Sequence, residues 1–286
     1  MTMQASELVK GIAKLASLPE VCIRVNEMVD DPRSSAADIG RVISRDTALT
    51  AQLLRMANSS FYNFPSKVDS ISRAVTVVGE RELRYLVLAL SAVRAFSQIP
   101  VELINMASFW RHSVYCGVVS RLVASHCHVL HSERLFVAGL LHDVGKLVMM
   151  NRIPEQVKDA LLQSAQSDRP MYEVENELFG FNHAEVSRAL LEQWNIPSAL
   201  CETVGCHHDV GKAEDARLDA AIVHIANVIA NRAEMVLEEG VTLPEVDSLA
   251  WEITGLSEEM IHIIADEASP LFAESWAMIQ PIVRQA

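Results

Sequence analysis

Apolar residues recur at helical spacing along almost the whole chain, and no segment shows the strict alternation expected of a half-buried strand. Ser35, with Asp38 three residues later, is typical of a helix start, because each side chain can bind the backbone N–H of the other. The stretch 80–96 is apolar on nearly every side, which predicts a buried central helix. The pattern therefore predicts an all-α fold.

Prolines, glycines and polar clusters separate the predicted helices. Ile99-Pro100 is typical of a hinge between two helical units. We therefore expect a two-lobed protein, with an N-terminal helical lobe over 1–100 and a helical bundle with C-terminal helices over 101–286. The predicted helices are 19–28, one beginning after Ser35, 48–57, 71–78, 80–96, 109–124, 132–150, 155–164, 183–194, 198–206, 215–238, 258–265 and 271–283.

Composition and charge narrow the class of protein. Half of the residues are apolar and 21% are charged, as in a globular protein. The net charge of -13 is uneven: residues 1–100 hold 12 Lys/Arg and 10 Asp/Glu (net +2), and residues 101–286 hold 12 and 27 (net -15). Binding to nucleic acid requires clustered cations, so we expect no nucleic-acid partner.

The sequence also bears on the cellular compartment. The longest apolar run, 85–93, is too short to cross a bilayer, so we expect no membrane association. The five cysteines are scattered and form no Cys-x-x-Cys pair, which argues against a disulfide framework. A reducing cytoplasm fits this pattern best.

Histidines gather around one His-Asp doublet in the second half of the chain. His142 and Asp143 stand at the polar edge of an apolar predicted helix, with Lys146 one turn later and near both. His112 interrupts a segment that is otherwise typical of a buried helix. The remaining candidates stand at the ends of predicted helices: His183, His207 and His208.

Imidazole and carboxylate ligands together suit zinc, iron, manganese or nickel. Such an ion lowers the pKa of the water that it binds to about 7, and Lys146 can neutralise a phosphate group that this water attacks. Two alternatives need no metal. His112, His142 and Asp143 can satisfy one another through hydrogen bonds, and histidines at helix ends also act as caps or surface groups.

The string Leu141-His142-Asp143-Val144-Gly145-Lys146, preceded by His112 in Trp-Arg-His-Ser, resembles the HD superfamily of metal-dependent phosphohydrolases. Strings in the first half narrow the resemblance to the HDOD branch, over about residues 15–208. The strings that carry it are Leu-Pro-Glu-Val at 18–21, Ile-Ser-Arg-Asp-Thr-Ala-Leu-Thr at 43–50, Leu-Arg-Met-Ala-Asn-Ser at 54–59 and Ser-Ile-Ser-Arg-Ala-Val at 70–75.

The resemblance implies an all-helical bacterial signal-transduction module that works through protein partners, often without catalytic activity. HD hydrolases take their last ligand from an aspartate, but Asn227 aligns with it here, and an amide oxygen is a weaker ligand than a carboxylate. The additional histidines resemble those of the HD-GYP phosphodiesterases. The metal-ligand positions that the resemblance implies are His112, His142, Asp143, His183, His207, His208 and Asn227.

Three functional hypotheses follow. The first is a regulatory HDOD module that contains a divalent iron, manganese, zinc or nickel centre. The second is an active phosphohydrolase that acts on a nucleotide or cyclic dinucleotide, with Asp143 and Lys146 as the catalytic candidates. The third is an interaction protein without a metal. Asn227 separates the first two, and His224, one turn before it, is either a substitute ligand or an ordinary half-buried histidine.

Overall fold

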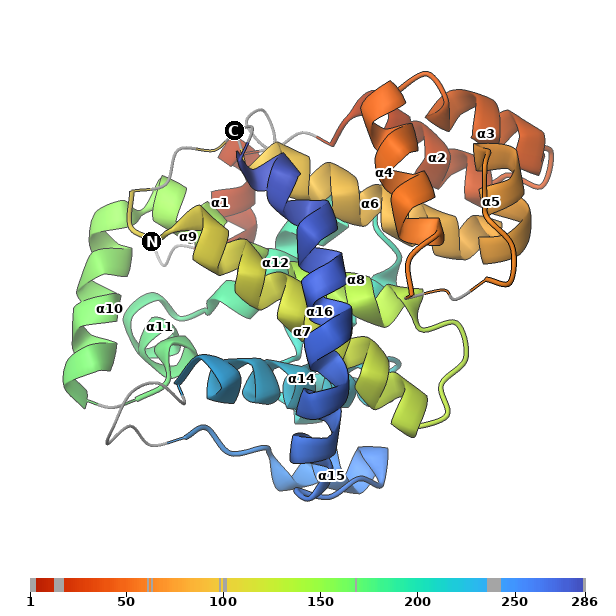
Figure 1. Ribbon diagram of the computed structural model, residues 1–286. Helices are drawn as coiled ribbons and strands as arrows, with labels where there is room; N and C mark the ends of the chain where they lie inside the picture. Colours follow the sequence, from red (N-terminus) through yellow and green to blue (C-terminus); the bar gives the residue numbers. More distant parts are fainter. Residues whose placement is uncertain are drawn as a thin grey trace.

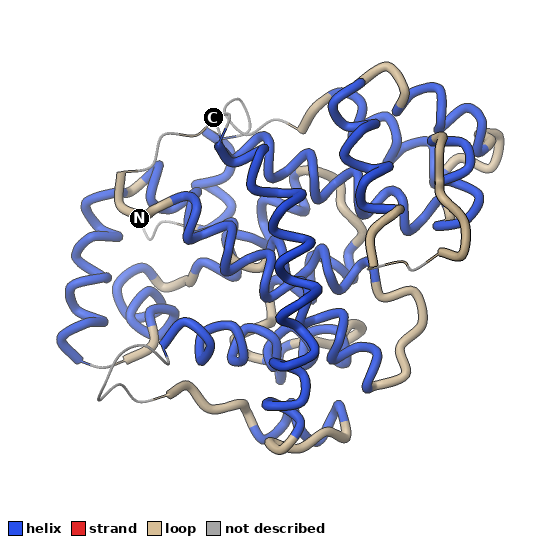
Figure 2. Tube along the Cα trace, in the orientation of Figure 1, coloured by secondary structure: helices blue, strands red, loops and turns tan. Residues whose placement is uncertain are grey.

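The computed structural model describes residues 4–12, 18–60, 62, 64–97, 99, 102–167, 169–235 and 243–284. These residues form α-helices, one short 3₁₀ helix and connecting loops, and no strand occurs among them (Figure 2). The predicted all-α fold class is confirmed. In this part of the chain, no helix is both long enough and apolar enough to span a membrane.

The helices of the first part of the chain are mostly short, and most of them lie together at one end of the molecule (Figure 1). They are α1 (Ala5–Ile12), α2 (Glu20–Asp30), α3 (Ala36–Ile43), α4 (Thr47–Ala57), α5 (Ile71–Val78) and α6 (Glu80–Ser97).

The second part of the chain forms a helical bundle that places the histidines. Its elements are α7 (Met106–His126), α8 (Glu133–Leu141), α9 (Val144–Arg152), α10 (Pro154–Ser167), α11 (Met171–Phe179), α12 (His183–Gln193), α13 (Ser198–Gly205), η1 (Val210–Lys212), α14 (Arg217–Met235), α15 (Ser248–Thr254) and α16 (Met260–Arg284).

Local sequence signals account for several helix starts. Ser35 and Asp38 form the predicted capping box at the start of α3. Helix α4 begins one residue before the predicted range 48–57, because Asp46 is the N-cap, and its carboxylate accepts a hydrogen bond from the N–H of Leu49. Gly79 separates α5 from α6 with a φ of 101°, a conformation that favours glycine.

Three helices connect the two parts of the molecule. The predicted buried helix is confirmed as α6, most of whose side chains lie in the core and which packs against α2, α4, α5, α8 and α16. Although α1 begins the chain, it packs against α9 and α12 of the bundle. The long α16 lies along α7 and also contacts α4 and α6 (Figure 1).

Several predicted helix boundaries are wrong. The single helix expected over 132–150 is broken at His142 and Asp143, because α8 packs on α6 and α7 while α9 packs on α10 and α12. The two helices expected around Pro270 are one continuous α16, whose packing along α7 compensates for the missing N–H. The sequence patterns also missed α1, α11 and α15.

Two predictions fall partly outside the described residues. Pro100, the centre of the expected hinge, lies outside them, as does the end of the helix expected over 215–238. The division into 1–100 and 101–286 therefore stays a prediction.

Candidate metal centre

The break between α8 and α9 places His142 and Asp143 at the centre of the bundle. Adjacent residues on a continuous helix point in directions about 100° apart. At the break, Asp143 has φ -102° and ψ 2°, and the carboxylate oxygen Oδ2 lies 3.3 Å from Nε2 of His142. Both side chains are almost completely buried, so this end-to-start junction of two helices forms the core of the site.

A first group of candidate ligands joins α7 to this junction. Its members are His112, His142 and Asp143, whose candidate ligand atoms all lie within 4.8 Å of one another. Nε2 of His112 lies 3.8 Å from Oδ2 of Asp143, and the rings of His112 and His142 are 5.4 Å apart between centroids.

A second group brings in α12 and the end of α13. It consists of Asp143, His183, His207 and His208, again with the candidate ligand atoms within 4.8 Å of one another. Nε2 of His183 lies 3.1 Å from Oδ1 of Asp143, and Nε2 of His207 lies 4.0 Å from the same oxygen. Nε2 of His208 lies 2.9 Å from Nε2 of His183. Asp143 therefore belongs to both groups.

Hydrogen bonds on the far side of the rings orient three of these histidines. Nδ1 of His142 lies 2.7 Å from the carbonyl oxygen of Gly139, and Nδ1 of His207 lies 2.7 Å from that of Val204. A carbonyl oxygen only accepts, so each Nδ1 carries the proton and donates it. The lone pair of each Nε2 then faces Asp143, which is the orientation that metal-binding histidines adopt.

His183 is oriented by a carboxylate. Its Nδ1 and its backbone N–H both donate to Oε2 of Glu175, at 2.6 Å and 2.9 Å. Glu175 is itself 1% exposed. A carboxylate behind a histidine raises the basicity of the ring and fixes its tautomer, as in many metal sites.

Several buried nitrogen and oxygen atoms at the centre have no hydrogen-bond partner in the part of the chain that the structure describes, and they show whether a metal ion fits here. Nε2 of His142, Nε2 of His207 and Oδ1 of Asp143 are buried and have no hydrogen-bond partner among the described residues. Their close contacts lack hydrogen-bond geometry, and leaving such groups unpaired costs about 1–3 kcal/mol each. Nitrogen and carboxylate donors that converge without protons between them match the preference of divalent transition metals. The residues present fit such an ion.

The electrostatics of the centre agree with that fit for every candidate ligand with a shifted pKa except His183, whose pKa is raised because Glu175 and Asp143 outweigh its burial. Burial alone would raise the pKa of Asp143, but His142 and Lys146 together outweigh burial and hold this pKa well below its usual value. Burial lowers the pKa of His142, and it lowers the pKa values of His207 and His208 well below the usual range. These rings are therefore neutral near neutral pH, the form that binds metals.

Asn227 lies on α14 beside the first group. Its Oδ1 is 3.3 Å from Nε2 of His112, and it also accepts a hydrogen bond of 2.9 Å from Nδ2 of Asn231. Oε1 of Glu234, further along α14, lies 3.2 Å from Nδ1 of His112. The structure therefore places the amide where the resemblance implied a carboxylate, with another carboxylate on the other side of the histidine ring.

A cavity of about 520 Å³ opens onto this side of the centre. Nζ of Lys146 donates to Oδ2 of Asp143 at 2.6 Å, and this lysine is 28% exposed toward the cavity. The lining residues are Ile104, Ser108, Phe109, Arg111, His112, Asp143, Lys146, Asn231, Ala233 and Glu234. A solute in the cavity can therefore reach both Asp143 and a cation.

Close packing between α9 and α12 positions the two halves of the second group. The hydroxyl of Ser187 accepts from the N–H of Gly145 and donates to the carbonyl oxygen of His142, both at 2.8 Å. A Cβ atom on Gly145 would lie 2.0 Å from the carbonyl oxygen of His183, so only glycine permits this approach.

The structure brings all eight candidate residues named from the sequence into this one region, but it leaves His224 outside both groups. Nδ1 of His224 lies 2.8 Å from the carbonyl oxygen of His207, and its Nε2 accepts from the N–H of Asp247. Sequence reasoning missed four residues whose side chains form hydrogen bonds or ion pairs with the candidate ligands or their backbone. They are Glu175, Ser187, Asn231 and Glu234.

The signals for those four residues were weak. Glu175 lies eight positions before His183, on a helix that the periodicity did not predict. Ser187, Asn231 and Glu234 are ordinary polar residues of predicted helices. The spacing of Asn231 and Asn227, four residues apart on one helix face, was the one usable indication.

The family assignment follows from the sequence and agrees with this fold and site. The HDOD domain family matches residues 15–210, which is most of the chain. The chain belongs to the HDOD family, as the resemblance indicated.

Two curated bacterial relatives are longer than this chain. An uncharacterized protein of Treponema pallidum is 26% identical over 217 residues, which cover 75% of this chain and 41% of the relative. The cyclic di-GMP phosphodiesterase CdgJ of Vibrio cholerae is 26% identical over 121 residues, which cover 42% of this chain and 27% of that protein. The chain thus spans less than half the length of either relative.

Solved structures share the fold over nearly the full length. An HDOD domain protein from Geobacter sulfurreducens superimposes with a TM-score of 0.73 at 22% identity, covering 97% of both chains. A candidate phosphohydrolase from Shewanella amazonensis gives the same TM-score and identity, covering 96% of this chain and 97% of that one. At this identity the likeness concerns the fold.

Proposed function

We propose that this chain is a regulatory module of a bacterial signalling pathway, which acts through protein partners and holds a divalent transition metal at Asp143. One observation carries the metal part of this proposal. Buried nitrogen and oxygen atoms of His142, His207 and Asp143 converge without hydrogen-bond partners among the described residues. The outward hydrogen bonds of the histidines leave ligand lone pairs facing inward.

Asn227 favours a regulatory role over a catalytic one. An amide brings no negative charge to the side of the centre that faces the open cavity. Metal ions at this side are held less tightly by a neutral ligand than by a carboxylate. His183 and His207 of the second group are essentially unexposed, whereas His112 of the first group is 9% exposed, so a structural ion is best supported in the second group.

Metal content tests this proposal directly. Purified protein should contain close to stoichiometric iron, manganese, zinc or nickel by elemental analysis, and His142→Ala should lower that content. His262→Ala is the matched control, because His262 is exposed on α16 and far from the centre in sequence. A wild-type protein without transition metal, even after incubation with each ion, would show that the metal proposal is wrong.

A second candidate function is hydrolysis of a phosphodiester in a nucleotide or cyclic dinucleotide. The observation that favours it is the cavity, which Asp143, Lys146 and Arg111 all line. Lys146 and Arg111 would bind the anionic phosphate oxygens and orient the substrate over Asp143. A bound divalent metal would supply Lewis acidity and acidify water. CdgJ, a relative of this chain, is named as a cyclic di-GMP phosphodiesterase.

Activity assays separate the two functions. The metal-loaded protein is incubated with cyclic di-GMP and with a chromogenic phosphodiester, in parallel with His142→Ala and Lys146→Met. Hydrolysis by the wild type that both substitutions abolish would replace the regulatory proposal with the catalytic one. A metal-loaded protein that hydrolyses neither compound supports the regulatory role.

A further inference from the structure

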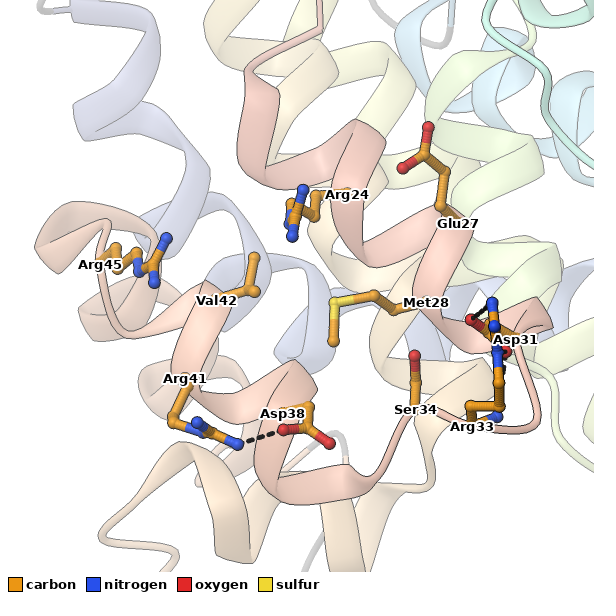
Figure 3. Close-up of a pocket in the computed structure, with 10 residues that line it drawn as sticks. All are labelled: Arg24, Glu27, Met28, Asp31, Arg33, Ser34, Asp38, Arg41, Val42 and Arg45. Carbon is orange, nitrogen blue, oxygen red and sulfur yellow. Dashed lines mark hydrogen bonds and ion pairs between the residues drawn. The ribbon is translucent and has the colours of Figure 1, made fainter.

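A groove between α2 and α3 lies outside the metal centre and has no role in the function proposed so far. It contains a cavity of about 620 Å³, which is within the range of ligand-binding pockets (Figure 3). The residues that line it are Arg24, Glu27, Met28, Asp31, Arg33, Ser34, Asp38, Arg41, Val42 and Arg45.

Two of the four arginines in this groove already have acidic partners. Arg33 forms an ion pair of 2.9 Å with Asp31, and Arg41 pairs with Asp38 (Figure 3). These two ion pairs neutralise the charges of Arg33 and Arg41, so the groove carries less positive charge than its four arginines alone would give it.

The other two arginines are free to bind an anion. The side chains of Arg24 on α2 and Arg45 just after α3 form no hydrogen bond or ion pair with any described residue. Figure 3 shows them on opposite walls of the groove, with Val42 between them. Glu27 is the one unpaired acidic residue in the lining, and the figure shows it at the outer edge.

The groove continues beyond the first cavity. A neighbouring cavity of about 270 Å³ extends toward Pro19 and shares Arg24, Val42 and Arg45 with the first. It also adds two carboxylates, that of Glu20 and that of Asp46, which already pairs with Arg94. Val42 and Met28, both half-buried, form an apolar floor under the arginines. The surface is therefore an open, extended groove with an apolar floor and an arginine on each wall.

The lining argues against a nucleotide as the occupant. None of the residues that line either cavity is aromatic, so a base finds no stacking surface. The N-terminus of α3 does not favour phosphate either, because the capping box uses the N–H groups of Ser35 and Asp38 and places the negative carboxylate of Asp38 at the helix start.

A peptide that carries both carboxylates and apolar side chains matches the two features of the groove, its arginines that pair with no described residue and its apolar floor. Arginines bind carboxylates through paired N–H···O bonds, and they are enriched at the energetically important positions of protein interfaces. Apolar side chains of the same peptide would pack on Met28 and Val42. The charge of the surrounding region agrees, since residues 1–100 carry +2 while the remainder of the chain carries -15.

We propose that the groove between α2 and α3 docks an acidic segment of a partner protein, with carboxylates bound by Arg24 and Arg45. This inference rests on the proposed regulatory function through protein partners, and it adds the chemical character of the partner segment. The apolar residues of the segment lie on the floor of the groove, and its carboxylates lie toward the two walls.

Fluorescence polarisation with two labelled peptides tests the proposal on the full chain. One short peptide alternates leucine and glutamate, and the other has lysine in place of each glutamate. The acidic peptide should bind the wild type and the basic one should not. The double variant Arg24→Glu/Arg45→Glu should weaken binding of the acidic peptide by about tenfold or more.

Arg55→Glu is the matched control, because Arg55 is an exposed arginine on α4 outside the groove. It should leave binding within about a factor of two of the wild type. Thermal unfolding of each variant checks that the fold is intact, as expected for exposed arginines. Equal binding to the wild type and the double variant would overturn the proposal, as would no binding of the acidic peptide to the wild type.

Two further arms separate this inference from its alternatives. If a fluorescent ATP analogue binds the wild type and not the double variant, while the acidic peptide binds neither, the groove is a phosphate site and the peptide proposal fails. Metal content is measured on the same preparations, and the double variant should retain that of the wild type. If the wild type contains the expected metal but does not bind the acidic peptide, only the docking proposal is wrong. If the wild type binds the peptide as expected but contains no metal, only the metal proposal is wrong.

Discussion

Asn227 is the residue at which a single substitution should most directly change the metal affinity of the centre. Its amide oxygen lies 3.3 Å from Nε2 of His112, at the side of the centre that adjoins the cavity. We expect Asn227→Asp to tighten divalent metal binding by about tenfold, because a carboxylate adds a negative charge at this short range. Calorimetric titration of metal-free protein with Mn²⁺ measures the change.

The control for this substitution is Gln166→Glu, which adds the same charge on the exposed surface of α10. It should leave the affinity unchanged, since exposed charges at a distance are screened. Equal affinities for Asn227→Asp and the wild type would place residue 227 outside the metal shell.

Glu175 is the residue whose role the sequence did not reveal. It accepts hydrogen bonds from both the ring and the backbone of His183, and it is buried. We expect Glu175→Gln to weaken metal binding by about 10- to 100-fold, because the amide no longer raises the basicity of the ring. Titration with Zn²⁺ or Mn²⁺ measures this loss, and Glu177→Gln on the same helix is the control.

Glu177 is a suitable comparison because its carboxylate is 54% exposed and pairs with Arg169, outside the centre. Its replacement should change neither metal affinity nor the unfolding temperature by more than the error of measurement. Unaltered metal binding by Glu175→Gln would mean that His183 is not held as a ligand by this carboxylate.

At the scale of helices, the approach of α9 to α12 sets the distance between Asp143 and His183. A Cβ atom on Gly145 would meet backbone atoms, at 2.0 Å from the carbonyl oxygen of His183 and 2.7 Å from the nitrogen of Ser187. We expect Gly145→Ala to destabilise the protein by about 1–3 kcal/mol and to lower its metal content, because the two helices must separate. Urea unfolding and elemental analysis measure the two effects.

Gly211→Ala provides the comparison, since the nearest atom to its Cβ would be Oδ1 of Asp209 at an ordinary 3.5 Å. If Gly145→Ala is as stable and as metal-rich as Gly211→Ala, the close packing of α9 on α12 does not hold the centre together.

Predictability also differs among the helices. Periodicity and caps were enough for α3, α5 and α6, whose signals are local. They were insufficient for α16, where Pro270 argued for an end but packing along α7 keeps the helix continuous. They also missed the break between α8 and α9, because nothing in an apolar stretch shows which neighbour each half will pack against.

Across the whole molecule, the residue types of the centre could be predicted but their partners could not. The histidines and Asp143 carry a recognisable spacing, whereas the contacts that hold them join distant parts of the chain. Nε2 of His112 and Oδ1 of Asn227 meet across 115 positions, and Ser60 donates to Glu274 across 214. Such pairs depend on how the helices assemble, which the pattern of one sequence does not specify.

The pH dependence of unfolding is a property of the whole metal-free molecule that follows from its buried histidines. Burial lowers the pKa values of His142, His207, His208 and His224. Burial also acts on His183, but Glu175 and Asp143 together outweigh it and raise the pKa of that ring. A histidine with a lowered pKa in the folded state binds fewer protons there than in the unfolded chain. Its contribution to stability is therefore lost as the pH falls below about 6.5.

The four histidines with lowered pKa values outnumber the one with a raised value, so the net effect should be a loss of stability on acidification. We expect the unfolding temperature of chelator-treated protein to fall as the pH decreases from about 7 to about 5.5, a window in which ordinary carboxylates remain ionised. Differential scanning calorimetry measures this slope, and His207→Asn should reduce it because one such group is removed. An unfolding temperature that rises over this window would show that His183 and the surface charges dominate the response instead.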